Sequence, residues 1–209
     1  MVSRAPRPSP ADLAAAHGRR LPDLIRPGLD VLFCGINPSL YSAAVQRHFA
    51  RPGNRFWRTL HAAGFTERVL SPSEQAELLE LGIGLTNVVP TASASAAELT
   101  VDDYRRGCAG LRRKLARYRP RNIAFLGMGA YRIAAQEPLA TVGRQAEPFA
   151  GIVAWALPNP SGLNAHYPLA ELARCYSELA RALRPAQPPA QPHVEPAGEA
   201  ARSSQRVRS

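Results

Sequence analysis

The chain has 209 residues, enough for one domain with a full hydrophobic core and additional ends. No stretch reaches the roughly 20 apolar residues that a membrane-spanning helix needs, and the first 20 residues lack the apolar core of a secretory signal. These features argue against a membrane partner and predict a cytoplasmic, nucleoid-associated protein. An Arg-rich organelle transit peptide is the alternative interpretation of the N-terminal residues.

The charge balance favours a nucleic-acid partner. The formal net charge is +10, and Lys114 is the only lysine among the 26 basic residues. Arginine makes bidentate contacts with phosphate and stacks on bases, so an Arg-rich, strongly basic chain suits DNA. Codon usage in a GC-rich genome explains the preference for Arg over Lys equally well, but not the size of the net charge.

The cysteine pattern gives no sign of a metal centre. Cys34, Cys108 and Cys175 lie far apart, without the C-x-x-C spacing that zinc sites and iron–sulfur clusters use. We expect buried, reduced thiols, and neither a metal nor another cofactor.

Composition divides the chain into three parts. Residues 1–20 are rich in Pro, Arg and Ala and predict a disordered basic leader, with partial helix as an alternative. Residues 21–184 carry the alternating patterns of one folded domain. Residues 185–209 predict a disordered Pro/Arg-rich tail, either merely solvated or acting as a DNA tether.

Short apolar runs alternate with helical patterns along the central part. This alternation predicts an α/β fold, a three-layer α/β/α sandwich around a mostly parallel sheet of four to five strands. Taken in chain order, the expected elements are a strand over 30–36, helices over 54–63 and 73–81 (the latter capped by Ser73), a strand over 83–89, a helix over 100–118, a strand over 122–127, a helix over 129–136, a strand over 152–157 and a helix over 168–183.

Asparagines lie at or just beyond the carboxyl ends of three of these strands. Asn37, Asn87 and Asn159 should meet, because the carboxyl ends of parallel strands share one edge of the sheet. Amides can hold a nucleobase by hydrogen bonds and position a water, but they cannot act as a strong general base or nucleophile. Asn37 and Asn159 each precede proline, so a structural role in a turn is the alternative for both.

An aromatic and basic cluster follows the first strand. Phe49 offers a ring for stacking, and the run Asn54-Arg55-Phe56-Trp57 adds basic and aromatic groups. An amide, a ring and cations together suit a flat polar ligand attached to phosphates, which suggests a nucleobase. Trp57 fits an ordinary core position equally well.

Four motifs give the chain a family resemblance. GINP at 35–38, HFARPGNRFW at 48–57, GLTN at 84–87 and LPNPSGL at 157–163 closely resemble the mismatch-specific uracil/thymine-DNA glycosylases of the uracil-DNA glycosylase superfamily. Order and spacing agree over residues 29–183. The resemblance implies a monofunctional monomeric enzyme that flips a base from double-stranded DNA and hydrolyses its N-glycosidic bond without a cofactor.

The resemblance also implies roles for individual residues. Asn37 would orient the attacking water, and Asn159 would hydrogen-bond the uracil carbonyl as charge develops on the leaving base. Phe49 would stack on the extruded base, Asn87 would read its polar edge, and the backbone near Ile36 would complete recognition.

A loop after the fourth expected strand would engage the DNA. Leu163 is a suitable apolar wedge for the vacated stack, supported by Ser161, Gly162 and Asn164. We expect Arg55 to act with these residues where the wedge enters the DNA and where the protein contacts the DNA backbone.

The sequence departs from the family pattern at three places. Ser39 stands where relatives usually carry Gly, and its hydroxyl would narrow the pocket or bind a phosphate. Pro90-Thr91 replaces a charged pair, with Ser93 as a candidate pocket hydroxyl. Ala165 replaces an Arg that reads the opposite strand, which leaves His166 as a substitute or as a plain surface residue.

The favoured function is therefore excision of uracil, preferably from G·U mismatches, with ethenocytosine or thymine as further substrates. Two alternatives stay within the superfamily: a preference for hypoxanthine or xanthine, and a catalytically silent DNA-binding relative. A nucleotide-binding α/β protein is a third, but GINPSL matches neither Gly-rich phosphate loop.

Overall fold

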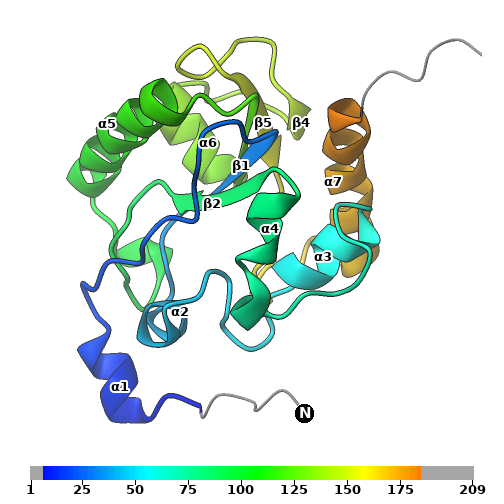
Figure 1. Ribbon diagram of the computed structural model, residues 1–209. Helices are drawn as coiled ribbons and strands as arrows, with labels where there is room; N and C mark the ends of the chain where they lie inside the picture. Colours follow the sequence, from blue (N-terminus) through cyan, green and yellow to red (C-terminus); the bar gives the residue numbers. More distant parts are fainter. Residues whose placement is uncertain (1–6, 185–209) are drawn as a thin grey trace, which may run out of the picture.

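The computed structural model describes residues 7–184, which form a five-stranded sheet covered by helices (Figure 1). The strand order is β2-β1-β3-β5-β4. Four strands are parallel, and the two-residue β4 pairs antiparallel with β5 at one edge. The predicted α/β fold with a mostly parallel sheet is confirmed. The strands span β1 Val31–Gly35, β2 Ile83–Asn87, β3 Asn122–Leu126, β4 Gly143–Arg144 and β5 Val153–Leu157.

Helices cover both faces of the sheet because each central strand is apolar on both sides. Val31 and Phe33 of β1 enter one core cluster, whereas Leu32 and Cys34 enter the other. The first cluster receives α3 (Phe56–Ala62), α4 (Glu77–Glu80) and α7 (Leu169–Leu183), and the second receives α5 (Val101–Tyr118) and α6 (Met128–Ala135).

Helix α5 connects β2 to β3 and lies close to the chain that leaves β2. A capping box between Thr100 and Asp103 begins the helix, as the sequence predicts. Gly107 permits the close approach, since a Cβ at this position would lie 2.5 Å from the carbonyl oxygen of Val88. The start of α5 is thereby held near the carboxyl edge of the sheet.

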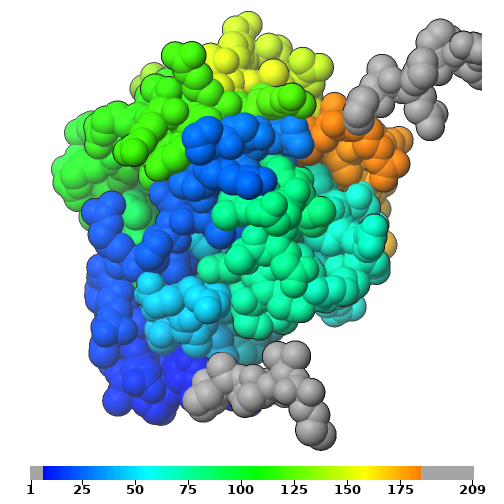
Figure 2. Space-filling model, in the orientation of Figure 1, coloured from blue at the N-terminus to red at the C-terminus, as the bar shows by residue number. Residues whose placement is uncertain are grey.

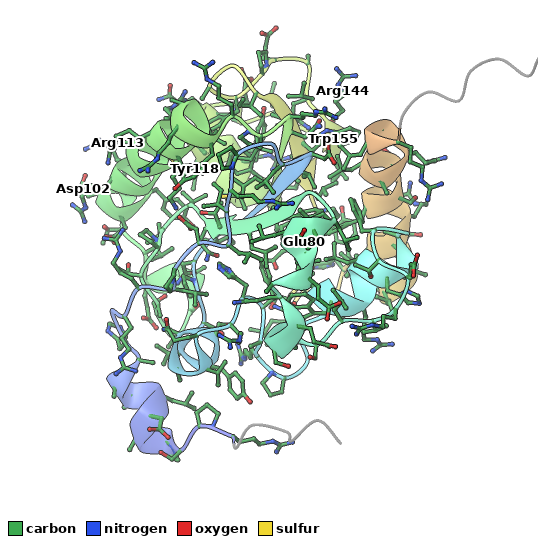
Figure 3. All side chains as sticks on the ribbon, viewed as in Figure 1. Glu80, Asp102, Arg113, Tyr118, Arg144 and Trp155 are labelled. Atoms are coloured by element: carbon green, nitrogen blue, oxygen red, sulfur yellow. The ribbon has the colours of Figure 1, made fainter. Side chains whose placement is uncertain are left out.

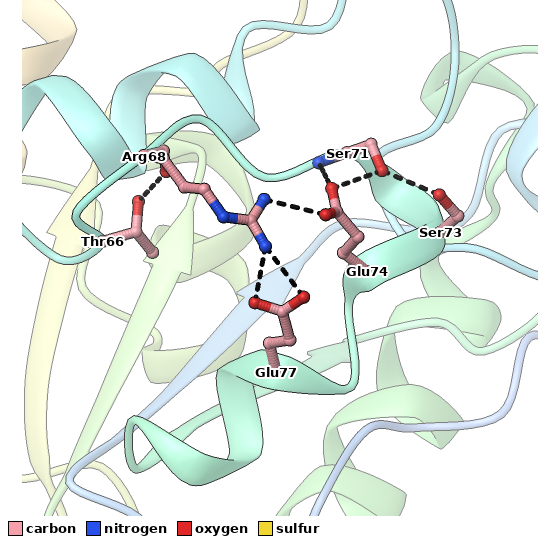
Figure 4. A network of polar contacts seen from close by, with 6 residues as sticks. All are labelled: Thr66, Arg68, Ser71, Ser73, Glu74 and Glu77. Carbon is pink, nitrogen blue, oxygen red and sulfur yellow. Dashed lines mark hydrogen bonds and ion pairs between the residues drawn. The ribbon is translucent and has the colours of Figure 1, made fainter. Parts of the chain in front are cut away.

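The helix predicted over 73–81 is broken into two pieces. A 3₁₀ turn, η1 (Pro72–Glu74), is followed by the single-turn α4, and the residue before η1 is Ser71 rather than Ser73. The carboxylate of Glu74 accepts hydrogen bonds from the backbone and hydroxyl of Ser71, and Arg68 bridges Glu74 to Glu77 (Figure 4). These hydrogen bonds and ion pairs stabilise a turn at this position in place of a continuous helix.

Three short elements were not expected from the sequence. Helix α2 (Leu40–Val45) follows β1, the 3₁₀ turn η2 (Ala96–Glu98) precedes α5, and β4 adds the edge strand. Each of these elements is too short for its apolar residues to show a helical or strand periodicity.

From residue 7 onward the leader follows the partly helical alternative rather than disorder. Helix α1 (Pro10–Ala15) begins with a capping box between Ser9 and Asp12. The next residue, Ala16, is buried against Ala43 and Ala92. Small apolar side chains are a weak sequence signal, so this packing was missed. Figure 2 shows these N-terminal residues, in blue, running along one side of the molecule. The expected tail at 185–209 lies outside the described residues.

None of the helices within residues 7–184 combines the length and apolar character needed to cross a membrane.

Candidate functional site

A cavity of about 500 Å³ opens at the carboxyl ends of β1, β2 and β5. It contains ten of the twelve residues proposed from the sequence, and only Arg55 and Gly162 lie outside its lining. The residues expected at the site that line it are Ile36, Asn37, Ser39, Phe49, Asn87, Ser93, Asn159, Ser161, Leu163 and Asn164.

Strand register brings Asn87 against the end of β1. Gly35 and Asn87 are paired neighbours at the ends of β1 and β2. A Cβ on Gly35 would lie 2.5 Å from Asn87 Oδ1 and 3.3 Å from the Phe49 ring, so glycine is required for this contact. Asn87 is only 4% exposed, and its side chain has no hydrogen-bond partner among residues 7–184. It therefore presents an unused amide to the cavity.

The amide of Asn37 is oriented by a short relay of hydrogen bonds. Its Nδ2 donates to Ser93 Oγ at 2.8 Å, and Ser93 Oγ donates to the carbonyl of Ser95 at 2.7 Å. Because Nδ2 donates to Ser93, the Oδ1 of Asn37 is the group free to accept a hydrogen bond from a water or ligand. The backbone of Ser93 also pairs with that of Ser39 in an isolated β-bridge.

Phe49 is held in a left-handed backbone conformation and lines the same cavity as Asn37 and Asn87. Its φ is 51°, which is uncommon for a bulky residue. The ring stacks on Phe56 of α3, with centroids 4.1 Å apart and planes 28° from parallel. Phe56 thus supports the Phe49 ring from the core and keeps it at the cavity.

The opposite wall is the loop that follows β5. Asn159 Oδ1 accepts from the backbone N–H of Ser161 at 2.9 Å, and Asn164 Nδ2 donates to the carbonyl of Asn159 at 3.0 Å. The Oδ1 is used within the loop, so the donor Nδ2 of Asn159 is the polar group left for a ligand. Tyr176 of α7 supports the loop by donating to the carbonyl of Pro158.

Arg55 holds this loop from inside, and the contact with DNA expected of it stays a prediction. Its guanidinium donates to the carbonyl oxygens of Tyr167, Ser161 and Asn164 at 2.6 to 2.8 Å, and its Nε donates to Pro160 at 3.4 Å. These four carbonyls accept from four of the five N–H groups of the guanidinium. No local pattern in the sequence predicts these contacts, because they join residues more than 100 positions apart.

Gly162 and Leu163 form the tip of the loop. A Cβ on Gly162 would lie 2.5 Å from the carbonyl oxygen of Gly53, so glycine allows the two loops to touch. Leu163, in contrast, is 77% exposed. A large apolar side chain this exposed at the mouth of a polar cavity is suited to insertion into an apolar or stacked partner.

Ser39 has a structural role that its sequence context does not indicate. Its hydroxyl accepts from the backbone N–H of Ser42 and caps α2. The same hydroxyl donates to Ser42 Oγ, which in turn accepts from the N–H of Ala50. Both hydroxyls therefore fix the chain that leads to Phe49.

His48 is a lining residue that sequence reasoning missed. It is 1% exposed, and its Nε2 lies 2.9 Å from the carbonyl of Pro22. Burial lowers the pKa of His48, so the ring is neutral at pH 7 with Nε2–H as the donor. Its position directly before Phe49 was the available signal, but burial of a single His cannot be inferred from one sequence.

The cavity lining contains no carboxylate within the described part of the chain. Residues 7–184 also contain no group of three His, Cys, Asp or Glu side chains that could hold a metal ion. The arrangement can bind a flat polar ring by amide hydrogen bonds and stacking, and it can hold a water against Asn37 Oδ1. It lacks a strong general base.

Comparison with known proteins agrees with this arrangement. The model of the Uracil DNA glycosylase superfamily matches residues 22–183. A solution NMR structure of a candidate uracil DNA glycosylase from Methanosarcina acetivorans superimposes with a TM-score of 0.55 at 21% sequence identity. The match covers 78% of this chain and 98% of the other, and at this identity it supports the fold alone.

Proposed function

The chain belongs to the uracil DNA glycosylase superfamily, and on that premise we propose that residues 21–184 form a DNA-repair glycosylase that excises uracil from duplex DNA, preferably opposite guanine. The observation that carries the proposal is the cavity at the carboxyl edge of the sheet, which is lined by five asparagines, Asn37, Asn87 and Asn159 among them, and by Phe49, without a carboxylate. Thymine and ethenocytosine are further substrates that the same chemistry would accept.

Access to the base requires that it leaves the helical stack. Flipping costs a few kcal/mol of stacking and pairing, and it costs less at a mismatch, which favours G·U over A·U. Leu163 would enter the vacated space, because it is exposed beside the cavity on a loop that Arg55 holds in place. The extruded base would then stack on Phe49.

Hydrolysis would depend on positioning and on stabilising the leaving base. Asn37 Oδ1 would accept a hydrogen bond from the attacking water, with the amide oriented by Ser93. Asn159 Nδ2 would donate to a uracil carbonyl as negative charge develops on the base, and Asn87 would read its edge. Because no carboxylate activates the water, the enzyme should be slow.

A labelled duplex with one uracil opposite G tests this proposal, alongside duplexes with uracil opposite A, single-stranded uracil, and hypoxanthine. Alkali cleaves the abasic product, and binding is measured separately by fluorescence anisotropy. We expect the G·U duplex to be cleaved fastest, and Asn37→Ala to lower excision by about 100- to 1000-fold with DNA affinity retained. Preferred cleavage of hypoxanthine would transfer the assignment to a different lesion. Binding without cleavage of any substrate would refute the glycosylase assignment.

A further inference from the structure

A second cavity, of about 390 Å³, lies between α5 and two segments packed against it. One segment carries Arg20, and the other is the chain of residues 88–91 that leaves β2. Four of the lining side chains are basic and one is acidic: Arg20, Arg106, Arg113, Lys114 and Asp103.

Two of the four cations already have carboxylate partners. Lys114 pairs with Asp23 at 2.7 Å, and Arg106 pairs with Asp103 at 2.8 Å. Neither Arg20 nor Arg113 has an ion-pair or hydrogen-bond partner for its side chain among residues 7–184. The cavity thus retains two uncompensated guanidinium groups, which is the group that matches phosphate oxygens in a bidentate manner.

The cavity has room for a ligand because α5 carries glycine there. Arg106, Gly110 and Arg113 follow the i, i+4, i+7 spacing that places residues on one helix face. The Nη2 of Arg113 lies 3.9 Å from where a Cβ of Gly110 would be, so its guanidinium lies over a position without a side chain. Figure 3 shows Arg113 projecting from α5.

The second cavity adjoins the first. Arg20 lines the second cavity, and the next residue, Leu21, lines the first. In the same way Thr91 lines the second cavity and Ser93 lines the first. A bridge between Arg20 and Thr91 joins the two segments into one wall. DNA lying across the first cavity would therefore have its backbone close to the second.

We propose that this second cavity is a phosphate-binding site in which Arg20 and Arg113 hold one or more phosphate groups. A DNA backbone beyond the flipped nucleotide is the first source of phosphate, and that source rests on the proposed function. A free phosphorylated small molecule is the second source.

The test compares two double variants with equal loss of charge. Arg20→Gln with Arg113→Gln removes the cavity guanidiniums, whereas Arg105→Gln with Arg117→Gln removes two exposed cations of α5 outside it. Anisotropy with a uracil-free duplex gives the dependence of log K on log salt. The cavity variant should lower the slope by about 2, near the value for two lost phosphate contacts, and the control should change it by much less.

Titration calorimetry with inorganic pyrophosphate separates the two sources. Pyrophosphate binding that the cavity variant abolishes, with duplex binding equal in both variants, assigns the site to a free phosphorylated ligand. The proposal is overturned if the wild type does not bind pyrophosphate and the two double variants show either equal changes of slope or no change. The duplex contains no uracil, so an absence of excision would refute the proposed function and leave this test intact.

Discussion

The two walls of the first cavity are built in different ways. The wall at β1 and β2 is set by strand register: Asn87 is 4% exposed, and glycine at 35 lets backbone and side chains touch. The wall after β5 is a loop whose shape depends on one side chain, Arg55, and whose tip leaves Leu163 77% exposed. One wall is fixed by the sheet and the other by long-range hydrogen bonds.

This difference predicts a division of labour. Residues on the sheet wall are held rigidly, so changes there should alter the geometry of the chemical step while leaving DNA affinity intact. Residues on the loop wall hold an exposed element, so changes there should weaken engagement of duplex DNA more than hydrolysis of an accessible base.

Among the changes that compare the two walls, Gly35→Ala should have the largest effect. The added Cβ would lie 2.5 Å from Asn87 Oδ1, so both Asn87 and Phe49 must shift. Displacements of this size can lower rates by about 100-fold, and we expect at least that loss of excision with little change in DNA affinity. Single-turnover assays and anisotropy measure the two quantities.

Gly129→Ala is the matched control for this substitution. A Cβ at Gly129 meets no atom within 4 Å, and the residue lies in α6, where alanine is the better helix former. An equal loss of excision in the control, or an unchanged rate for Gly35→Ala, would contradict the importance of the contact between β1 and Asn87.

Strand-end chemistry could be predicted from the sequence because it depends on local rules. An apolar run, a glycine and an Asn-Pro pair locate a strand end, and parallel order then brings Asn37, Asn87 and Asn159 to one edge. The structure has all three lining one cavity. Their catalytic roles remain predictions.

Long-range contacts could not be predicted in the same way. The bonds of Arg55 join α3 to a loop over 100 residues later, so nothing near Arg55 distinguishes it from an exposed arginine. The hydroxyl of Ser39 caps α2, a helix too short to show a period. Burial of Ala16 depends on two distant alanines.

Replacement of Arg55 tests the loop wall. Arg55→Lys keeps the charge but cannot donate along four directions, so several carbonyls lose their partner. We expect about 2 kcal/mol less unfolding free energy, and about tenfold slower excision from duplex DNA, the loss of roughly 1.4 kcal/mol of transition-state stabilisation. Single-stranded uracil should be affected less. Chemical denaturation and the two substrates measure these effects.

Arg58→Gln is the control on the same helix, since Arg58 is exposed. Equal slowing on duplex and single-stranded substrates by Arg55→Lys would show that the loop wall acts on chemistry, and would remove the distinction between the two walls.

Ser93→Ala tests the relay that orients Asn37. Loss of the hydroxyl leaves Asn37 Nδ2 without its 2.8 Å acceptor, so the amide can turn. We expect about a tenfold fall in kcat, or roughly 1.4 kcal/mol, with KM nearly unchanged and recovery in Ser93→Thr. Ser95→Ala keeps the backbone carbonyl that accepts from Ser93 and should retain activity. A change in KM alone would assign Ser93 to substrate binding.

His48 gives the smallest effect and a pH-dependent one. Burial lowers the pKa of His48 in the folded chain below the usual 6.5 of the unfolded chain. At a pH between the folded and the unfolded pKa, the unfolded chain therefore binds more protons than the folded one. The stability from this group is complete above pH 6.5 and is lost as pH falls through the folded pKa, with a slope of at most about 1.4 kcal/mol per pH unit. Denaturation of wild type and His48→Gln should give parallel curves above pH 6.5 and a steeper decline for wild type below it. Glu74, whose pKa is lowered to about 2 by hydrogen bonds from Ser71, contributes at lower pH to both proteins alike. Curves that remain parallel down to pH 5 would show that His48 is not buried in its neutral form, and that this part of the sheet wall is open to solvent.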